Sequence, residues 1–81
     1  MTDSQVLGAD LDALKSHLRS RGRDALVHDI EDAMLAGSTS LEIHFRLRGA
    51  LRMLRPQVAD DQNAVRLVDE MVPLIGRITG G

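Results

Sequence analysis

The fold is decided most clearly by residues 39–55, which read TSLEIHFRLRGALRMLR. The aliphatic side chains of this stretch recur at helical spacing and cluster within about a quarter of the helix circumference, at ~100° per residue. They are Ile43, Leu47, Ala50, Leu51 and Leu54. Thr39 and Glu42 have capping-box spacing, in which each side chain binds the other residue's free backbone amide. Pro56 disfavours helical geometry in the residue before it. We therefore expect a helix over residues 40–54.

Three further segments carry aliphatic residues at helical spacing. They are expected to form helices at residues 4–21, 24–36 and 60–78. Alternation with a period of two never persists beyond a few residues, so no strand is expected. Because short connections favour antiparallel neighbours, the sequence predicts an all-α fold. We expect a compact bundle of four short helices, in a single domain that spans residues 1–81.

Capping chemistry predicts where these helices begin. Ser4 or Asp3 is expected to cap the first helix, and Asp60 or Asp61 the fourth, because their side-chain oxygens can accept hydrogen bonds from free backbone amides.

Glycine and proline predict where the helices end. Gly22 is expected to stop the first helix in a left-handed conformation, and Gly37 is expected to stop the second helix. Pro73 lies within the fourth aliphatic stripe and is expected to kink or end that helix, because it lacks an amide donor.

The composition excludes several classes of protein. The chain has 81 residues, of which 43% are hydrophobic and 27% charged, with a formal net charge of −2 and no cysteine. The lack of cysteine excludes disulfide frameworks, cysteine-based zinc sites and thiol nucleophiles. No run of 18 apolar residues is present, so no membrane span is expected. The first residues lack the basic and apolar regions of a secretory signal, so we expect a cytoplasmic protein.

The small size favours self-association. A lone core in so short a chain gives a folding balance near zero. A second copy can supply the missing burial, so a homodimer with twofold symmetry is expected. Arginine outnumbers lysine nine to one. We interpret this as the codon bias of a GC-rich bacterial or phage genome.

The helix at residues 40–54 carries one unusual surface opposite its aliphatic stripe. The residues of this surface, within about 80° of one another on a helical wheel, are Leu41, Phe45, Arg48, Arg52 and Arg55. Phe45 is the only aromatic residue of the chain. Residues 43–59 contain four arginines and no acid, whereas residues 24–32 contain four acids and no Lys or Arg. The charges are therefore segregated by helix.

Three interpretations of this surface stay open. Another helix of the same bundle can cover Leu41 and Phe45, with the arginines paired to acids of the second helix. These acids are Asp29, Glu31 and Asp32. Alternatively the surface binds another protein, because Arg and aromatic residues are enriched at protein interfaces. In the third interpretation the arginines contact nucleic-acid phosphates.

The turn at Gly37 offers a test of the nucleic-acid interpretation. Ala33, Gly37 and Ile43 resemble the spacing of a small residue, a glycine and a buried apolar residue in bacterial helix-turn-helix proteins. The resemblance implies that the helix at residues 40–54 enters the major groove of DNA. The residues that it would place against the bases are Thr39, Ser40, His44 and Arg48. However, Asp32 stands where such motifs usually bury an apolar residue.

No catalytic or cofactor motif is present in the sequence. The three histidines, His17, His28 and His44, fall on three different predicted helices. No nucleophile elbow, phosphate-binding glycine loop or nucleotide fingerprint appears. We therefore expect no enzyme activity, no metal and no small-molecule cofactor.

The sequence thus favours a small regulatory or adaptor protein that acts through protein–protein interaction with another protein, with itself, or with both. A dimeric helix-turn-helix DNA-binding regulator, which would use residues 40–54, is the alternative.

Overall fold

The computed structural model describes residues 1–80, and within them it contains four α-helices, one short 3-10 helix and no strand. The elements are α1 (Asp3–Ser20), α2 (Asp24–Leu35), α3 (Ser40–Leu54), η1 (Arg55–Val58) and α4 (Gln62–Thr79). The predicted all-α class and the small four-helix bundle are confirmed. Every helix begins and ends within two residues of its predicted bounds.

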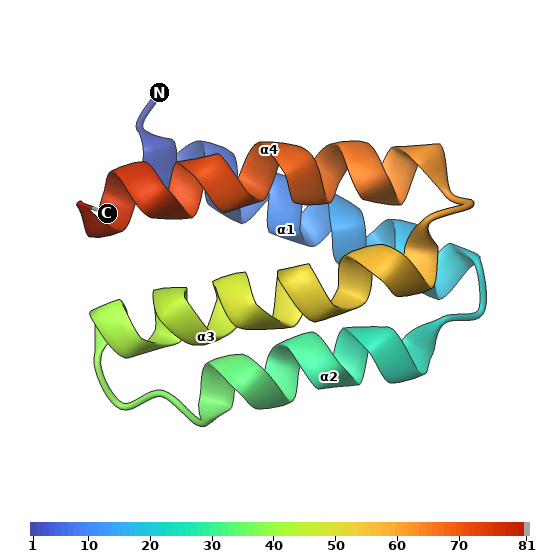
Figure 1. Cartoon of the computed structure of the whole chain (residues 1–81), viewed down its shortest axis with the longest axis horizontal. Helices are drawn as coiled ribbons and strands as arrows, with labels where there is room; N and C mark the ends of the chain where they lie inside the picture. Colours follow the sequence, from blue (N-terminus) through green and yellow to red (C-terminus); the bar gives the residue numbers. More distant parts are fainter. Residues whose placement is uncertain (81) are drawn as a thin grey trace.

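Successive helices run in opposite directions along the bundle (Figure 1). α1 packs against α4, α2 packs against α3, and contacts of α3 with α4 and of α1 with α2 close the arrangement. This is the up-down-up-down topology that short connections favour. The start of α1 and the end of α4 lie at the same end of the bundle as the turn between α2 and α3 (Figure 1).

The core is aliphatic and draws on all four helices and η1. α1 buries its predicted stripe, and α3 buries Leu47, Leu51 and Leu54. Its predicted neighbours Ile43 and Ala50 are only half-buried, because they face the edge toward α2. Within residues 1–80 no aromatic side chain enters the core, so the aliphatic stripes suffice for it, as expected from the sequence.

The start of α1 differs from the prediction. Its cap is Thr2, where Ser4 or Asp3 was expected. The Thr2 hydroxyl accepts a hydrogen bond from the Gln5 amide at 3.2 Å, and the Gln5 side-chain oxygen accepts one from the Thr2 amide at 2.9 Å. This reciprocal capping box satisfies two free backbone donors at once, whereas Ser4 or Asp3 alone would satisfy one.

The starts of α3 and α4 confirm predicted caps. The Asp61 carboxylate accepts a hydrogen bond from the Ala64 amide at 3.3 Å. The Thr39 hydroxyl accepts one from the Glu42 amide at 3.1 Å. The Glu42 side chain instead accepts a hydrogen bond from the Ser38 hydroxyl at 3.2 Å, so it supports the turn before α3.

The expected interruption at Pro73 does not end α4, which continues to Thr79. Pro73 lies on the exposed side of the helix, while Met71, Leu74 and Ile75 around it are buried. Packing of these neighbours holds the helix together across the missing donor, and the freed carbonyl of Asp69 belongs to an exposed residue.

Gly37 lies just after the end of α2, close to the predicted stop, and the predicted left-handed conformation is found at Gly22. The helix ends at Leu35, and positive φ angles occur at Gly22 and Gly80, not at Gly37. A Cβ atom at Gly37 would lie 2.8 Å from the backbone nitrogen of Ile43. Gly37 is therefore needed for the close approach of the turn to the first turn of α3.

Candidate functional site

Helix α3 is anchored to the bundle because three of its leucines are buried in the core. Leu47, Leu51 and Leu54 are each 3% exposed or less. The opposite side of the α3 backbone therefore has a defined position relative to the bundle. We call Leu41, Phe45, Arg48 and Arg52 the α3 face.

The apolar residues of the α3 face are open to solvent. Leu41 is 50% exposed and Phe45 is 43% exposed. The guanidinium carbon of Arg48 lies 5.1 Å from the centre of the Phe45 ring, within the range of a cation–π contact. This contact orients both side chains. The neighbouring helices thus leave about half of the chain's only aromatic residue uncovered.

The arginines predicted for this surface separate into two groups. Arg52 is exposed on the α3 face. Arg55 is tied to α4, where its Nε and Nη2 atoms donate hydrogen bonds of 2.7 and 3.0 Å to the Asp69 carboxylate. The hydrogen bonds and positive charge of Arg55 hold the pKa of Asp69 below its ordinary value, and Asp69 raises the pKa of Arg55. Arg55 therefore anchors α3 to α4.

The acids of α2 do not provide the expected partners for these arginines. Glu31 lies 3.7 Å from the amine of Lys15 and 3.9 Å from a guanidinium nitrogen of Arg19, both on α1. Within residues 1–80, no ion pair shorter than 4.0 Å joins an arginine of α3 to Asp29 or Asp32. For Arg55 the intramolecular interpretation of the surface holds, with Asp69 of α4 as the partner in place of an acid of α2.

The residues predicted for DNA contact mostly make local hydrogen bonds. Thr39 is the cap of α3, and the Nδ1 atom of His44 donates a hydrogen bond to the Ser40 carbonyl at 2.6 Å. Helices α2 and α3 lie side by side and antiparallel (Figure 1). In a helix-turn-helix the two helices cross at about 90–120°.

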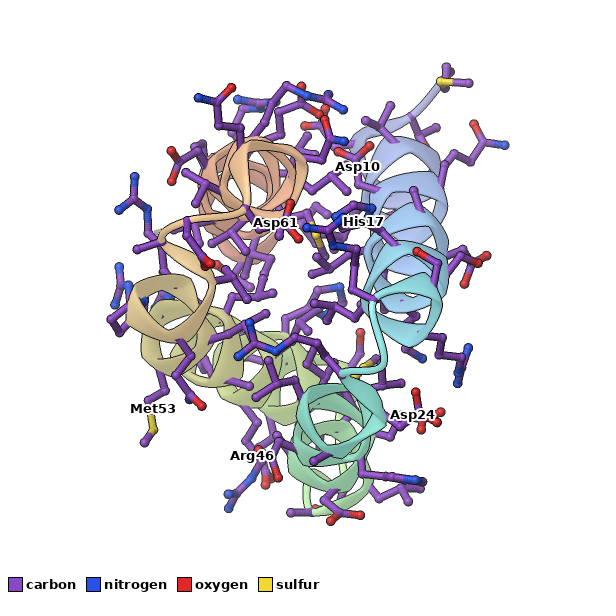
Figure 2. All side chains as sticks on the ribbon, turned by 90° about the vertical axis from the view of Figure 1, so that its right-hand side faces the viewer. Asp10, His17, Asp24, Arg46, Met53 and Asp61 are labelled. Carbon is purple, nitrogen blue, oxygen red and sulfur yellow. The ribbon has the colours of Figure 1, made fainter. Side chains whose placement is uncertain are left out.

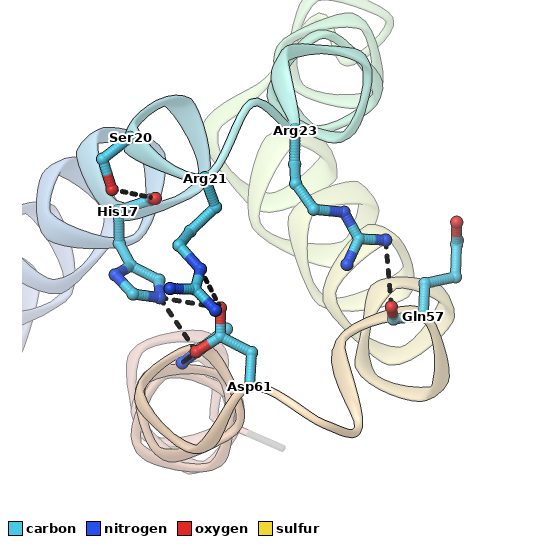
Figure 3. Close-up of polar contacts among 7 residues, drawn as sticks. His17, Ser20, Arg21, Arg23, Gln57 and Asp61 are labelled. Carbon is cyan, nitrogen blue, oxygen red and sulfur yellow. Dashed lines mark hydrogen bonds and ion pairs between the residues drawn. The ribbon is translucent and has the colours of Figure 1, made fainter.

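A polar cluster that the sequence did not predict joins α1 to α4. The Nε2 atom of His17 lies 2.9 and 2.8 Å from the two carboxylate oxygens of Asp61, and Nε of Arg21 lies 3.9 Å from one of them (Figure 3). Figure 2 shows His17 and Asp61 pointing toward one another between the two helices. Beside this cluster, Arg23 donates a hydrogen bond to the Gln57 carbonyl at 3.0 Å.

The cluster determines the protonation of Asp61. Burial raises the pKa of Asp61, but the hydrogen bonds from His17 and from the Ala64 amide, together with the charge of Arg21, outweigh burial. The pKa of Asp61 therefore lies below its ordinary value. Because this carboxylate also caps α4, one charged group fastens the start of α4 to the end of α1.

A second carboxylate between α1 and α4, that of Asp10, has a pKa that is shifted in the opposite direction. Asp10 has one carboxylate oxygen, Oδ2, that is buried and finds no hydrogen-bond partner in residues 1–80. Burial and the nearby negative charge of Glu70 raise the pKa of Asp10, and Arg66 offsets only part of this effect. Asp10 is therefore a source of repulsion at neutral pH.

Comparison with protein-family models, with curated proteins and with solved structures finds no match. None of the helices in residues 1–80 has both the length and the apolar character needed to cross a bilayer. In the same residues, no three His, Asp or Glu side chains are grouped so as to hold a metal ion.

Proposed function

We propose that this chain is a small, non-enzymatic, cytoplasmic adaptor or regulatory protein that binds another protein through the α3 face. The observation that supports the proposal is the position of Phe45. Phe45 is 43% exposed although the aliphatic core does not need it, and the guanidinium of Arg48 lies over its ring.

The α3 face has the chemistry of a protein-binding surface. The centres of protein interfaces are enriched in aromatic residues and arginine. A side chain that is already ordered loses less entropy on binding, and the stacked pair of Phe45 and Arg48 meets this condition. The exposed Arg52 favours a partner with Asp or Glu beside an apolar patch. The proposed partner therefore presents an apolar surface bordered by acids.

Protein is favoured over duplex DNA as the partner. Leu41 and Phe45 are exposed apolar residues of the α3 face, where phosphate or water would be a poor neighbour. The antiparallel packing of α2 and α3 differs from the crossed helices of a helix-turn-helix. A gel-shift experiment at low salt tests the DNA alternative, which predicts a shift that weakens steeply as salt is added.

The proposal is tested by capture from a lysate of the source cells, followed by affinity measurements with the purified captured protein. Phe45→Ser should weaken binding by about 30-fold or more, because interface hot spots contribute at least ~2 kcal/mol. Leu35→Ser is the matched control, since Leu35 is 81% exposed at the end of α2, outside the α3 face. Arg52→Glu should weaken binding most at low salt.

Two outcomes would contradict the proposal. One is a partner that binds the Phe45→Ser variant as tightly as the original chain. The other is a Leu35→Ser variant that loses binding to the same extent. Circular dichroism of each variant should show unchanged helix content.

A further inference from the structure

A shallow groove runs along the outer side of the α2–α3 pair, on the flank of α3 away from the α3 face. Its volume is about 550 Å³. Leu26, Ile30 and Leu54 line it from the core side, and the small residues Ala33, Gly49 and Ala50 line it as well. Figure 2 shows Arg46 and Met53 on this side, pointing away from α1 and α4.

The groove is open because α3 carries small residues there. A Cβ atom at Gly49 would meet nothing within 4 Å. Glycine in the interior of a helix is less favourable than alanine. Met53, at the edge of the groove, is 74% exposed. An occupant from outside the chain would explain both the open space and the exposed methionine.

Opposite charges stand on the two edges of the groove. Asp29 lies on α2 and Arg46 on α3, and within residues 1–80 neither has an ion-pair partner within 4.0 Å. Asp29 lies six residues before the last residue of α2, and Arg46 six residues after the first residue of α3. At 1.5 Å per residue, both lie about 9 Å from the end of the hairpin. Asp29 and Arg46 therefore lie at the same height along the axes of α2 and α3.

We propose that a second copy of this chain occupies the groove, with a twofold axis parallel to α2 and α3. A rotation about this axis leaves each residue at the same height along the helices. It therefore places α2 of each copy over α3 of the other and brings residues at the same height together. Asp29 of one copy then faces Arg46 of the second copy, and the reverse pair forms as well. An axis perpendicular to the helices would instead place the acidic α2 over the acidic α2 of the other copy.

The charges that line the groove support this arrangement. They are Asp29 on α2 and Arg46 on α3. Crossed pairing of α2 with α3 therefore matches opposite charges at two places in the interface. This interface uses Asp29, Arg46 and Met53, whereas the proposed function uses Phe45 and Arg52, so different substitutions test the two.

Charge exchange tests the proposal. The dissociation constant of the full chain is measured by sedimentation from micromolar to millimolar concentration. Asp29→Arg or Arg46→Asp alone places like charges in both crossed pairs and should raise the dissociation constant at least about tenfold. An equimolar mixture of the two single variants should recover a dimer, because both crossed pairs are then opposite in charge. Asp12→Arg, an exposed acid of α1, is the control for added positive charge.

Filling the groove gives an independent measurement. Gly49→Leu should weaken self-association at least about tenfold, because the side chain occupies the space meant for the second copy. Gly8→Leu is the matched control, since a Cβ atom there also meets nothing within 4 Å and Gly8 lies on α1. A chain that is monomeric at millimolar concentration would overturn the proposal. So would a dimer that Asp29→Arg leaves intact or that Phe45→Ser abolishes.

Discussion

Two glycines should respond in opposite ways to the same added methyl group. At Gly37 a Cβ atom would lie 2.8 Å from the nitrogen and 3.0 Å from the Cα of Ile43, both backbone atoms, and 2.9 Å from its Cγ1. At Gly8, inside α1, it would meet nothing within 4 Å. Neither residue has a positive φ angle, so alanine has no intrinsic backbone conflict at either position.

The magnitudes follow from these surroundings. Gly8→Ala should raise the free energy of unfolding by roughly 0.5–1 kcal/mol, the helix-interior difference between the two residues. Gly37→Ala should lower it by about 1–3 kcal/mol, because the turn and the first turn of α3 must separate to admit the methyl group. For a domain of this size, a change of 1 kcal/mol shifts Tm by about 4–8 °C. The two variants should therefore move Tm in opposite directions.

Urea denaturation followed by far-UV circular dichroism measures both changes. Each variant should shift the midpoint at unchanged slope, since neither alters the surface that unfolding exposes. Both substitutions reduce the entropy of the unfolded chain equally, so the difference between them isolates the clash with Ile43. The Gly37→Ala/Ile43→Ala double variant removes only the Cγ1 contact and should relieve only the side-chain part of the clash. A Gly37→Ala variant as stable as Gly8→Ala would refute the close approach between Gly37 and the backbone of Ile43.

The remaining predictions concern the contacts between helices. The pKa of Asp10 is raised in the folded chain, so its contribution favours folding below its ordinary value and is lost as the pH rises through the raised pKa. Asp10→Asn should therefore stabilise the chain at pH 7 by a few tenths of a kcal/mol, and this gain should vanish in acid when urea midpoints are compared across pH. The pKa of Asp61 is lowered, so its contribution is complete above its ordinary value and is lost as the pH falls through the lowered pKa. Asp61→Ala should cost about 1 kcal/mol or more at pH 7 through the lost cap, whereas Asp61→Asn should keep the cap and flatten the acid limb of the stability profile. Leu51→Ala, at a position with no exposed surface, should lower the free energy of unfolding by about 2–5 kcal/mol in the same assay.

Local sequence rules succeeded where one local interaction decides the outcome. The cap of α4 at Asp61, one of two candidates, was predicted because a side-chain oxygen acts within a few residues. The end of α3 at Leu54 was also predicted, but Arg55 keeps a right-handed helical conformation and begins η1, contrary to the effect expected of Pro56. The rules failed where packing decides. Pro73 was expected to kink or end α4, but the helix does not end there and continues to Thr79, with Met71, Leu74 and Ile75 buried around Pro73. The capping box at Thr2 and Gln5 was visible in the sequence as threonine followed three residues later by glutamine.

Contacts between distant residues could not be predicted from spacing alone. His17 and Asp61 are 44 residues apart, and Arg55 and Asp69 meet only because α3 and α4 pack together. Once the up-down topology is known, the end of α1 must lie beside the start of α4, and a charged cap at Asp61 becomes a natural partner for His17. The missing information was the order of neighbours around the bundle.

The same missing information explains why the outward arc of α3 looked like one surface in the sequence. Periodicity separates the buried leucines from the exposed arc, but it does not say which edge of that arc borders α2 and which borders α4. The structure places Arg46 and Met53 toward α2 and ties Arg55 to α4. On a helical wheel Phe45 and Arg52 lie about 100° from Arg46 and Met53. Two surfaces separated by that angle are altered by different substitutions, so Phe45→Ser should weaken partner binding without changing self-association, and Asp29→Arg should do the reverse.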